Sequence, residues 1–181
     1  MHPQLIAVKT ELDAASARLR ALSARLNEAA WLRRPAPGRW SAGECVAHLN
    51  LTSEAFLPLL RQGIDEARRL GGAAGARLRT GFPGWLVKRL AGPSRWIKVK
   101  TTPDFVPHSD RPGTELVAEF ERLQDELIGL LRSADGLPLD RVNVTSPFSA
   151  QVHYNLYAAF AVIPGHQFRH LAQAEDAAHG R

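Results

Sequence analysis

The sequence contains a single cysteine, Cys45, among its 181 residues. One cysteine excludes an internal disulfide framework and is typical of a protein kept in a reducing cytoplasm. No apolar run approaches the roughly 18 residues of a membrane-spanning helix, and the N-terminal residues lack the basic and apolar regions of a signal peptide. We therefore expect a cytoplasmic protein without a membrane span, in which the N-x-T motifs at Asn50 and Asn143 have no significance for glycosylation.

Familiar catalytic motifs are also missing. The sequence has no nucleophile with a neighbouring base, no glycine-rich phosphate loop, no cysteine pair with zinc-finger spacing and no carboxylate that stands out as a general base. What is present is ordinary for a globular protein: 45% hydrophobic and 23% charged residues, in a chain whose length suits one domain, residues 1–181. The net charge of +5 permits binding to nucleic acid or an anionic surface without requiring either.

Hydrophobic periodicity predicts four long helices. The first has apolar residues three and four positions apart from Leu5 to Leu26, and a turn at residues 31–40 follows it. The second begins at a capping box formed by Ser41 and Glu44, in which each side chain bonds the backbone N–H of the other residue. The third and fourth helices are predicted at residues 114–133 and 154–177, with an irregular stretch at residues 140–152 between them.

The connection between the second and third helices, residues 71–113, is rich in glycine and proline and is expected to form a lid. Residues 61–100 carry ten Lys or Arg and two acidic residues, a net charge of +8. Residues 82–90 are predicted to form a short amphipathic helix, whose tryptophan and basic residues are compatible with a membrane surface or nucleic acid. We favour the alternative in which the basic residues face solvent while four apolar residues pack over the bundle, namely Trp85, Leu86, Leu90 and Trp96.

These amphipathic segments, with no strand alternation of comparable length, predict an all-α four-helix bundle. His166 and His170 lie four residues apart, so a helix places both imidazoles on one face, after an expected kink at Pro164. His48 lies on the inner face of the second helix. Three imidazoles would hold a divalent cation, with zinc the first choice and nickel the second, and would leave a position open for a water or thiol that the cation acidifies.

Other interpretations of these residues remain open. A buried histidine is more often a hydrogen-bonded core residue than a ligand, and the H-x3-H pair also fits two partly exposed residues on a surface helix. Glu44 either orients His48 or serves only the capping box, and Cys45 either lines the cavity or fills the core. Three other histidines are set aside as ligands. His108 lies in the proline-rich connection, His153 lies too far from His166 along the predicted fourth helix, and His179 lies in the C-terminal tail.

Two segments carry a resemblance to a known family. Residues 38–44 (Gly-Arg-Trp-Ser-Ala-Gly-Glu) and 46–49 (Val-Ala-His-Leu) resemble the second-helix motif of the DinB/YfiT-like superfamily of four-helix metalloproteins, and residues 163–175 are similar to its fourth-helix motif. Residues 100–107 are similar to the connection in one branch of that family. The resemblance implies an up-down-down-up bundle with a metal held by three histidines, here His48, His166 and His170. Family members are described as metal-dependent hydrolases and as transferases or isomerases that use low-molecular-weight thiols.

Our leading hypothesis is a metal-dependent enzyme, either a hydrolase or a low-molecular-weight-thiol S-transferase, that acts on a small-molecule substrate beneath the lid of residues 71–113. One alternative is a non-catalytic metal- or ligand-binding stress-response module. Another is a basic surface that binds nucleic acid or a membrane through Trp85 and Trp96, although we expect no nucleic-acid partner. The resemblance and the apolar first helix favour a homodimer.

Overall fold

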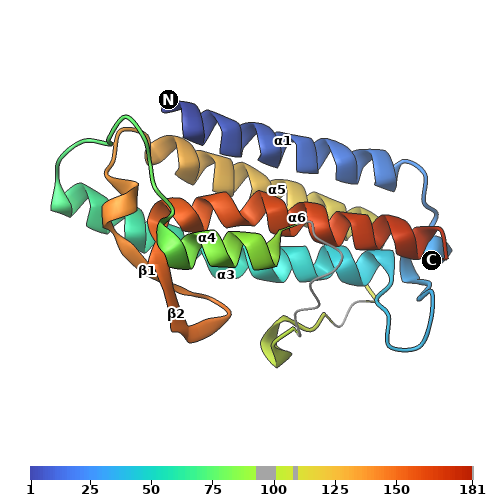
Figure 1. The fold of residues 1–181 in the computed structure, drawn as a ribbon. Coiled ribbons are helices and arrows are strands. Elements are labelled where there is room, and N and C mark those ends of the chain that lie inside the picture. The colour runs from blue at the N-terminus through green and yellow to red at the C-terminus, as the bar shows by residue number, and fades with distance from the viewer. Residues whose placement is uncertain (93–100, 108–109, 181) are drawn as a thin grey trace.

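The computed structural model describes residues 1–92, 101–107 and 110–180, and helices dominate it (Figure 1). Its elements in chain order are the α-helices, the short 3-10 helices (η) and the strands that follow: α1 (Pro3–Ser23), α2 (Glu28–Leu32), α3 (Ala42–Leu70), α4 (Gly81–Ala91), η1 (Pro103–Phe105), α5 (Gly113–Ser133), η2 (Leu139–Arg141), β1 (Asn143–Ser146), β2 (Ser149–Asn155) and α6 (Leu156–Ala178). The prediction of a mostly helical fold is confirmed, and the up-down-down-up order of a four-helix bundle stays a prediction. No helix within the described ranges is long and apolar enough to cross a membrane.

The long helices form where the apolar periodicity places them. The core residues of α1 recur three and four positions apart, as the sequence predicts: Leu5, Val8, Leu12, Ala15, Leu19 and Leu22. α3 begins at the predicted capping box, in which the Ser41 hydroxyl accepts from the Glu44 N–H (3.1 Å) and the Glu44 carboxylate accepts from the Ser41 N–H (2.8 Å). The turn predicted at residues 31–40 begins later than expected, because Trp31 still belongs to the short helix α2.

Helices α1, α3, α5 and α6 lie side by side (Figure 1). α3 contacts both α5 and α6, and α1 contacts the same two helices. Their buried apolar side chains form two clusters. Where α5 and α6 pass from one cluster to the other, the amide side chains of Gln124 and Gln167 bond to each other in both directions, at 3.0 and 2.9 Å.

The prediction of an irregular stretch at residues 140–152 is wrong, because a β-hairpin forms there. β1 pairs with β2 in antiparallel register, with Val144 opposite Tyr154. α6 consequently begins at Leu156, and Asn155 caps it by accepting the Ala158 N–H (2.9 Å). The β-branched and aromatic residues of this stretch favour strands, but Pro147 between them interrupts the alternation and obscured the pattern.

The short helix predicted at residues 82–90 is present as α4, but its large side chains do not pack over the bundle. Phe82, Trp85, Leu86 and Leu90 are all exposed, which overturns the arrangement we favoured from the sequence. α4 instead approaches α6 through Gly84, where an added Cβ would lie 2.4 Å from the Cβ of Ala158. Because the helix packs by its glycine face, its bulky residues turn outward. Trp96 lies outside the described residues.

Candidate metal site

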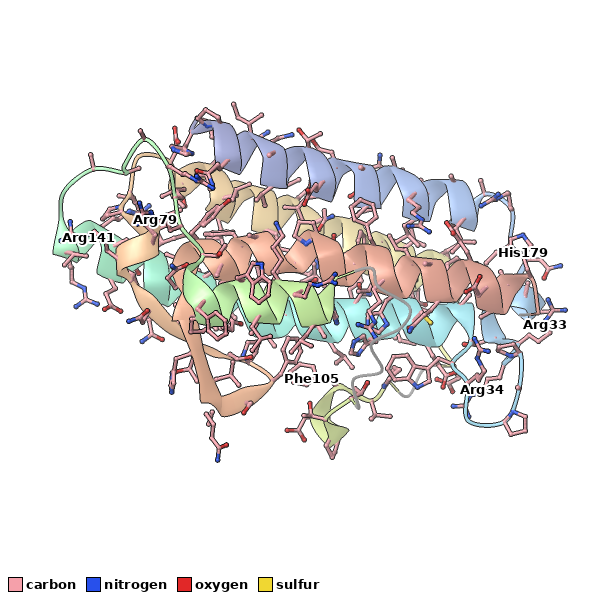
Figure 2. The ribbon with its side chains drawn as sticks, viewed as in Figure 1. Arg33, Arg34, Arg79, Phe105, Arg141 and His179 are labelled. Carbon is pink, nitrogen blue, oxygen red and sulfur yellow. The ribbon has the colours of Figure 1, made fainter. Side chains whose placement is uncertain are left out.

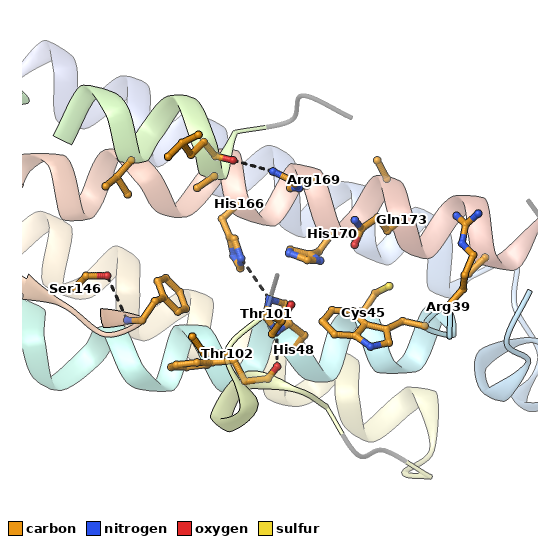
Figure 3. Close-up of a pocket in the computed structure, with 18 of the residues that line it drawn as sticks. Arg39, Cys45, His48, Thr101, Thr102, Ser146, His166, Arg169, His170 and Gln173 are labelled. Carbon is orange, nitrogen blue, oxygen red and sulfur yellow. Dashed lines mark hydrogen bonds between the residues drawn. The ribbon is translucent and has the colours of Figure 1, made fainter. Parts of the chain in front are cut away.

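Two long helices bring the three predicted histidines together. His48 projects from α3, and His166 and His170 project from α6 (Figure 3). α3 packs against α6, and the centroids of the three rings lie 5.2, 4.3 and 4.6 Å apart. One nitrogen of each ring lies within 4.8 Å of those of the other two. The cluster predicted from the sequence is therefore present, in a geometry compatible with a metal ion, while the role of its members as ligands stays a prediction.

A backbone carbonyl orients His48. The Nδ1 atom of this residue lies 2.7 Å from the carbonyl oxygen of Phe105 in η1. Since a carbonyl only accepts, Nδ1 carries the proton and donates, which leaves Nε2 with its lone pair. That Nε2 lies 3.3 Å from Nε2 of His166. Two nitrogen ligands of a tetrahedral zinc ion, with bonds of about 2.0–2.1 Å, would also lie about 3.3 Å apart.

The three rings are held in their neutral form. Burial lowers the pKa of His48 and lowers that of His170 well below its ordinary value. Burial, then the repulsion that a protonated His48 would exert and the charge of Arg169, lowers the pKa of His166 to about 3. The Nδ1 atom of His170 is buried and has no hydrogen-bond partner within the described residues. Three neutral, converging imidazoles fit a divalent cation, the more so because no described residue bonds to Nδ1 of one of them, His170.

The histidines line a cavity of about 930 Å³ whose walls differ in chemistry. Apolar side chains come from α4, η1 and the hairpin region: Val87, Leu90, Ala91, Phe105, Phe148 and Val152. Polar side chains of the turn before α3 and of α6 include Arg39 and Gln173, which Figure 3 shows on the far side of the histidines from Ser146. The hairpin and the segment before η1 add hydroxyl groups, from Ser146, Ser149, Thr101 and Thr102. The Trp40 ring packs against two of the histidines, with its centroid 5.0 Å from that of His48 and 5.9 Å from that of His170.

The two neighbours of His48 that the sequence singled out have other roles. Glu44 forms the capping box and accepts hydrogen bonds from the Arg34 guanidinium, one of them at 2.8 Å. Burial raises the pKa of Glu44, but the hydrogen bonds from Arg34 and Ser41 outweigh it and the net pKa is lowered. Cys45 both fills the core and lines the cavity. Burial raises its pKa to about 12, so the thiol stays protonated and is a poor nucleophile.

His153 and His179 do not join the cluster. His153 lies in β2 rather than in the fourth helix, and its Nδ1 is 3.1 Å from the Thr145 hydroxyl. His179 follows α6, with Nδ1 2.6 Å from the Glu175 carbonyl oxygen. His108 lies outside the described residues.

Sequence reasoning missed three contributors to the site: Trp40, Phe105 and Phe148. Phe105 acts through its backbone carbonyl, which leaves no trace in the amino-acid sequence. Phe148 reaches the cavity from the turn of the unpredicted hairpin, with its ring 5.9 Å from that of His166. Trp40 directly precedes the capping box, and that position next to a predicted helix start was the available signal.

Comparison with known families agrees with this geometry. The model of the DinB superfamily matches residues 11–174, a span that includes all three histidines. Searches of curated proteins and of solved structures find no significant match. The match covers most of the sequence and confirms the resemblance found in its motifs, and we conclude that the chain belongs to the DinB superfamily.

Proposed function

We propose that the chain is a metal-dependent enzyme in which His48, His166 and His170 hold a divalent cation, zinc first and nickel second. The observation that supports this proposal is the convergence of three neutral imidazoles in the wall of a cavity of about 930 Å³. Bound by three protein ligands, such a cation offers an open position and Lewis acidity to a water or thiol. The Phe105 carbonyl contributes by keeping Nδ1 of His48 protonated, so that Nε2 stays available.

The walls of the cavity define the class of small-molecule substrate. Phe105, Phe148 and Val152 offer contact to an apolar or aromatic group, whereas Arg39 and Gln173 offer hydrogen bonds to a polar one. A substrate, or a pair of substrates, with one apolar and one polar part suits a cavity with these two kinds of side chain. Hydrolysis of an ester or amide fits it, and so does transfer of a low-molecular-weight thiol to an electrophile. We keep both reactions, together with the homodimer, as predictions.

Metal content tests the ligand set directly. Protein purified without a histidine tag is expected to contain about one divalent ion per chain, and His48→Ala to lose it, because two imidazoles hold an ion far more weakly than three. His153→Ala is the matched control, since it removes an imidazole that hydrogen-bonds in the hairpin. Elemental analysis of the three proteins gives the answer. Equal metal content in the wild type and His48→Ala would contradict the proposal.

An activity assay distinguishes the proposed enzyme from a non-catalytic metal- or ligand-binding module. The metal-loaded protein should act either on a panel of esters and amides or on electrophiles offered with small thiols, and His48→Ala should be inactive in the same assay. Inactivity of the wild type in both panels, with the ion in place, would favour the non-catalytic binding module instead.

A further inference from the structure

The outer face of α4 carries an apolar patch that the proposed metal site does not use. Phe82, Trp85 and Leu86, which we call the α4 patch, are 73%, 54% and 40% exposed. Leu90 lies one turn after Leu86, is 38% exposed and also lines the cavity. The Phe82 and Trp85 rings stack, with centroids 5.9 Å apart and planes 27° from parallel. Burial of so many apolar atoms is favourable, and grouped exposed residues of this kind mark interaction surfaces.

The fit of α4 on α6 prevents the helix from burying this patch itself. Gly84 lies so close to Ala158 that no side chain fits between them, and the Arg169 guanidinium donates to the Leu90 carbonyl oxygen (2.8 Å). Val87 and Ala91, on the same inner face as Gly84, are partly buried. Rotation of the helix would break these contacts and place bulky side chains against α6. The patch is therefore a fixed feature of the surface.

The segment that carries the patch has charges of one sign only. Residues 67–92 contain six basic residues and no acidic one: Arg68, Arg69, Arg77, Arg79, Lys88 and Arg89. Lys88 and Arg89 are exposed on α4 itself, and helical spacing puts Arg89 on the same face as Phe82 and Leu86. Figure 2 shows Arg79, together with one further arginine, Arg141, at the end of the molecule where α4 begins.

This combination identifies the chemistry of the partner. Aromatic and leucine side chains that project from a helix beside basic residues suit an interface with anionic lipid, where rings and aliphatic chains enter the headgroup region and cations pair with phosphates. Nucleic acid would use the rings and the cations but would leave Leu86 and Leu90 in water. We propose that α4 docks the protein on an anionic lipid surface through the α4 patch, with Lys88 and Arg89 at the phosphates. This activity goes beyond the proposed enzyme and does not require its metal.

Co-sedimentation of the full chain with vesicles tests the proposal. Vesicles of phosphatidylcholine with about a third phosphatidylglycerol should bind the protein at least about tenfold better than phosphatidylcholine alone, and Lys88→Glu/Arg89→Glu should abolish that preference. Raising the salt to about 1 M, where the Debye length is about 3 Å, should weaken binding. The charge-matched control Arg25→Glu/Arg132→Glu, on exposed residues of other segments, should keep the preference.

The patch itself is tested by Phe82→Ser/Trp85→Ser, which should lower binding to the anionic vesicles at least about tenfold. Ile6→Ser/Leu32→Ser is the matched control, because these two apolar residues are 47% and 46% exposed on other helices, and it should bind like the wild type. Equal losses in both pairs, or no binding by the wild type at low salt, would overturn the proposal. One further result would overturn it: a wild-type protein that is dimeric and does not bind vesicles, and that becomes monomeric only when Phe82→Ser/Trp85→Ser is introduced. The patch would then bind a second copy of the chain.

Discussion

Two buried glutamines, Gln124 and Gln167, join α5 to α6 between the two apolar clusters. Each side chain donates to the carbonyl oxygen of the other, and Gln124 also donates to the backbone oxygen of Leu12 in α1 (2.8 Å). A polar group placed in a core without partners is costly, so this closed set of bonds favours one alignment of three helices over others. Gln167 also follows His166 directly, so this alignment sets where the histidine cluster lies relative to α1 and α5.

Replacement of Gln167 tests this pair. Gln167→Leu leaves the Gln124 carbonyl oxygen without its donor, and we expect the free energy of unfolding to fall by about 1–3 kcal/mol. Gln151→Leu, at an exposed position of β2, is the control and should change stability by less than about 0.5 kcal/mol. Urea denaturation followed by circular dichroism measures both. A loss in Gln167→Leu no larger than in the control would contradict the role of the pair.

Among the elements, α4 depends on its close approach to α6 at Gly84. Gly84→Ala places a methyl group 2.4 Å from the Cβ of Ala158, so we expect a loss of about 1–3 kcal/mol in the free energy of unfolding. Gly129→Ala in α5 is the matched control. An added Cβ there meets nothing within 4 Å, so the same substitution should stabilise the protein by up to about 1 kcal/mol.

The contact can also be restored from the other side. Adding Ala158→Gly to Gly84→Ala removes the opposing methyl group, and the double variant should recover most of the lost stability. If the double variant is no more stable than Gly84→Ala, the close approach is not what holds α4.

The sequence predicted the positions of the helices better than it predicted which side of each helix is buried. Apolar periodicity located α1, α3, α5 and α6, because each buries one stripe of side chains and the stripe is visible in the chain. For α4 the same rule failed, since a small residue rather than a large one makes the contact, and periodicity gives weight to large apolar residues. The hairpin was missed because its stability comes from cross-strand pairs such as Val144 with Tyr154, which the order of residues does not display.

At the scale of the whole molecule, an ion pair ties the first helix to the last. The Arg18 guanidinium donates two hydrogen bonds to the Glu175 carboxylate, at 2.8 and 2.7 Å. The bond from Arg18 is the main cause that lowers the pKa of Glu175 in the folded protein. A lowered pKa means that the pair contributes its full stabilisation above the ordinary carboxyl pKa, and that this contribution disappears as the pH falls through the lowered value.

The pH dependence of stability tests this pair. At neutral pH, Glu175→Gln should lower the free energy of unfolding by about 0.5–1 kcal/mol, a modest value because both side chains are partly exposed. The difference from the wild type should shrink below about pH 4.5, the ordinary carboxyl pKa, and disappear as the pH falls through the lowered pKa of Glu175. Chemical denaturation of both proteins across this range gives the comparison. A difference that stays constant with pH would rule out a charge effect.

The candidate site was predictable only in part. His48, His166 and His170 could be identified because helical spacing and inward orientation are encoded locally and the family motifs contain them. The Phe105 carbonyl and the cavity walls could not, since they come from η1, the hairpin and α4, whose positions depend on contacts between distant parts of the chain.

The histidines and the cavity walls lie on different elements, so they can change independently in evolution. The three imidazoles sit on long helices whose stability comes from the core, whereas most of the apolar residues around the cavity sit on short segments at its edge. Substitutions at Val87 or Val152 can therefore alter the molecules that fit without moving an imidazole. A single inherited scaffold can in this way change the shape of its cavity while its three histidines stay the same.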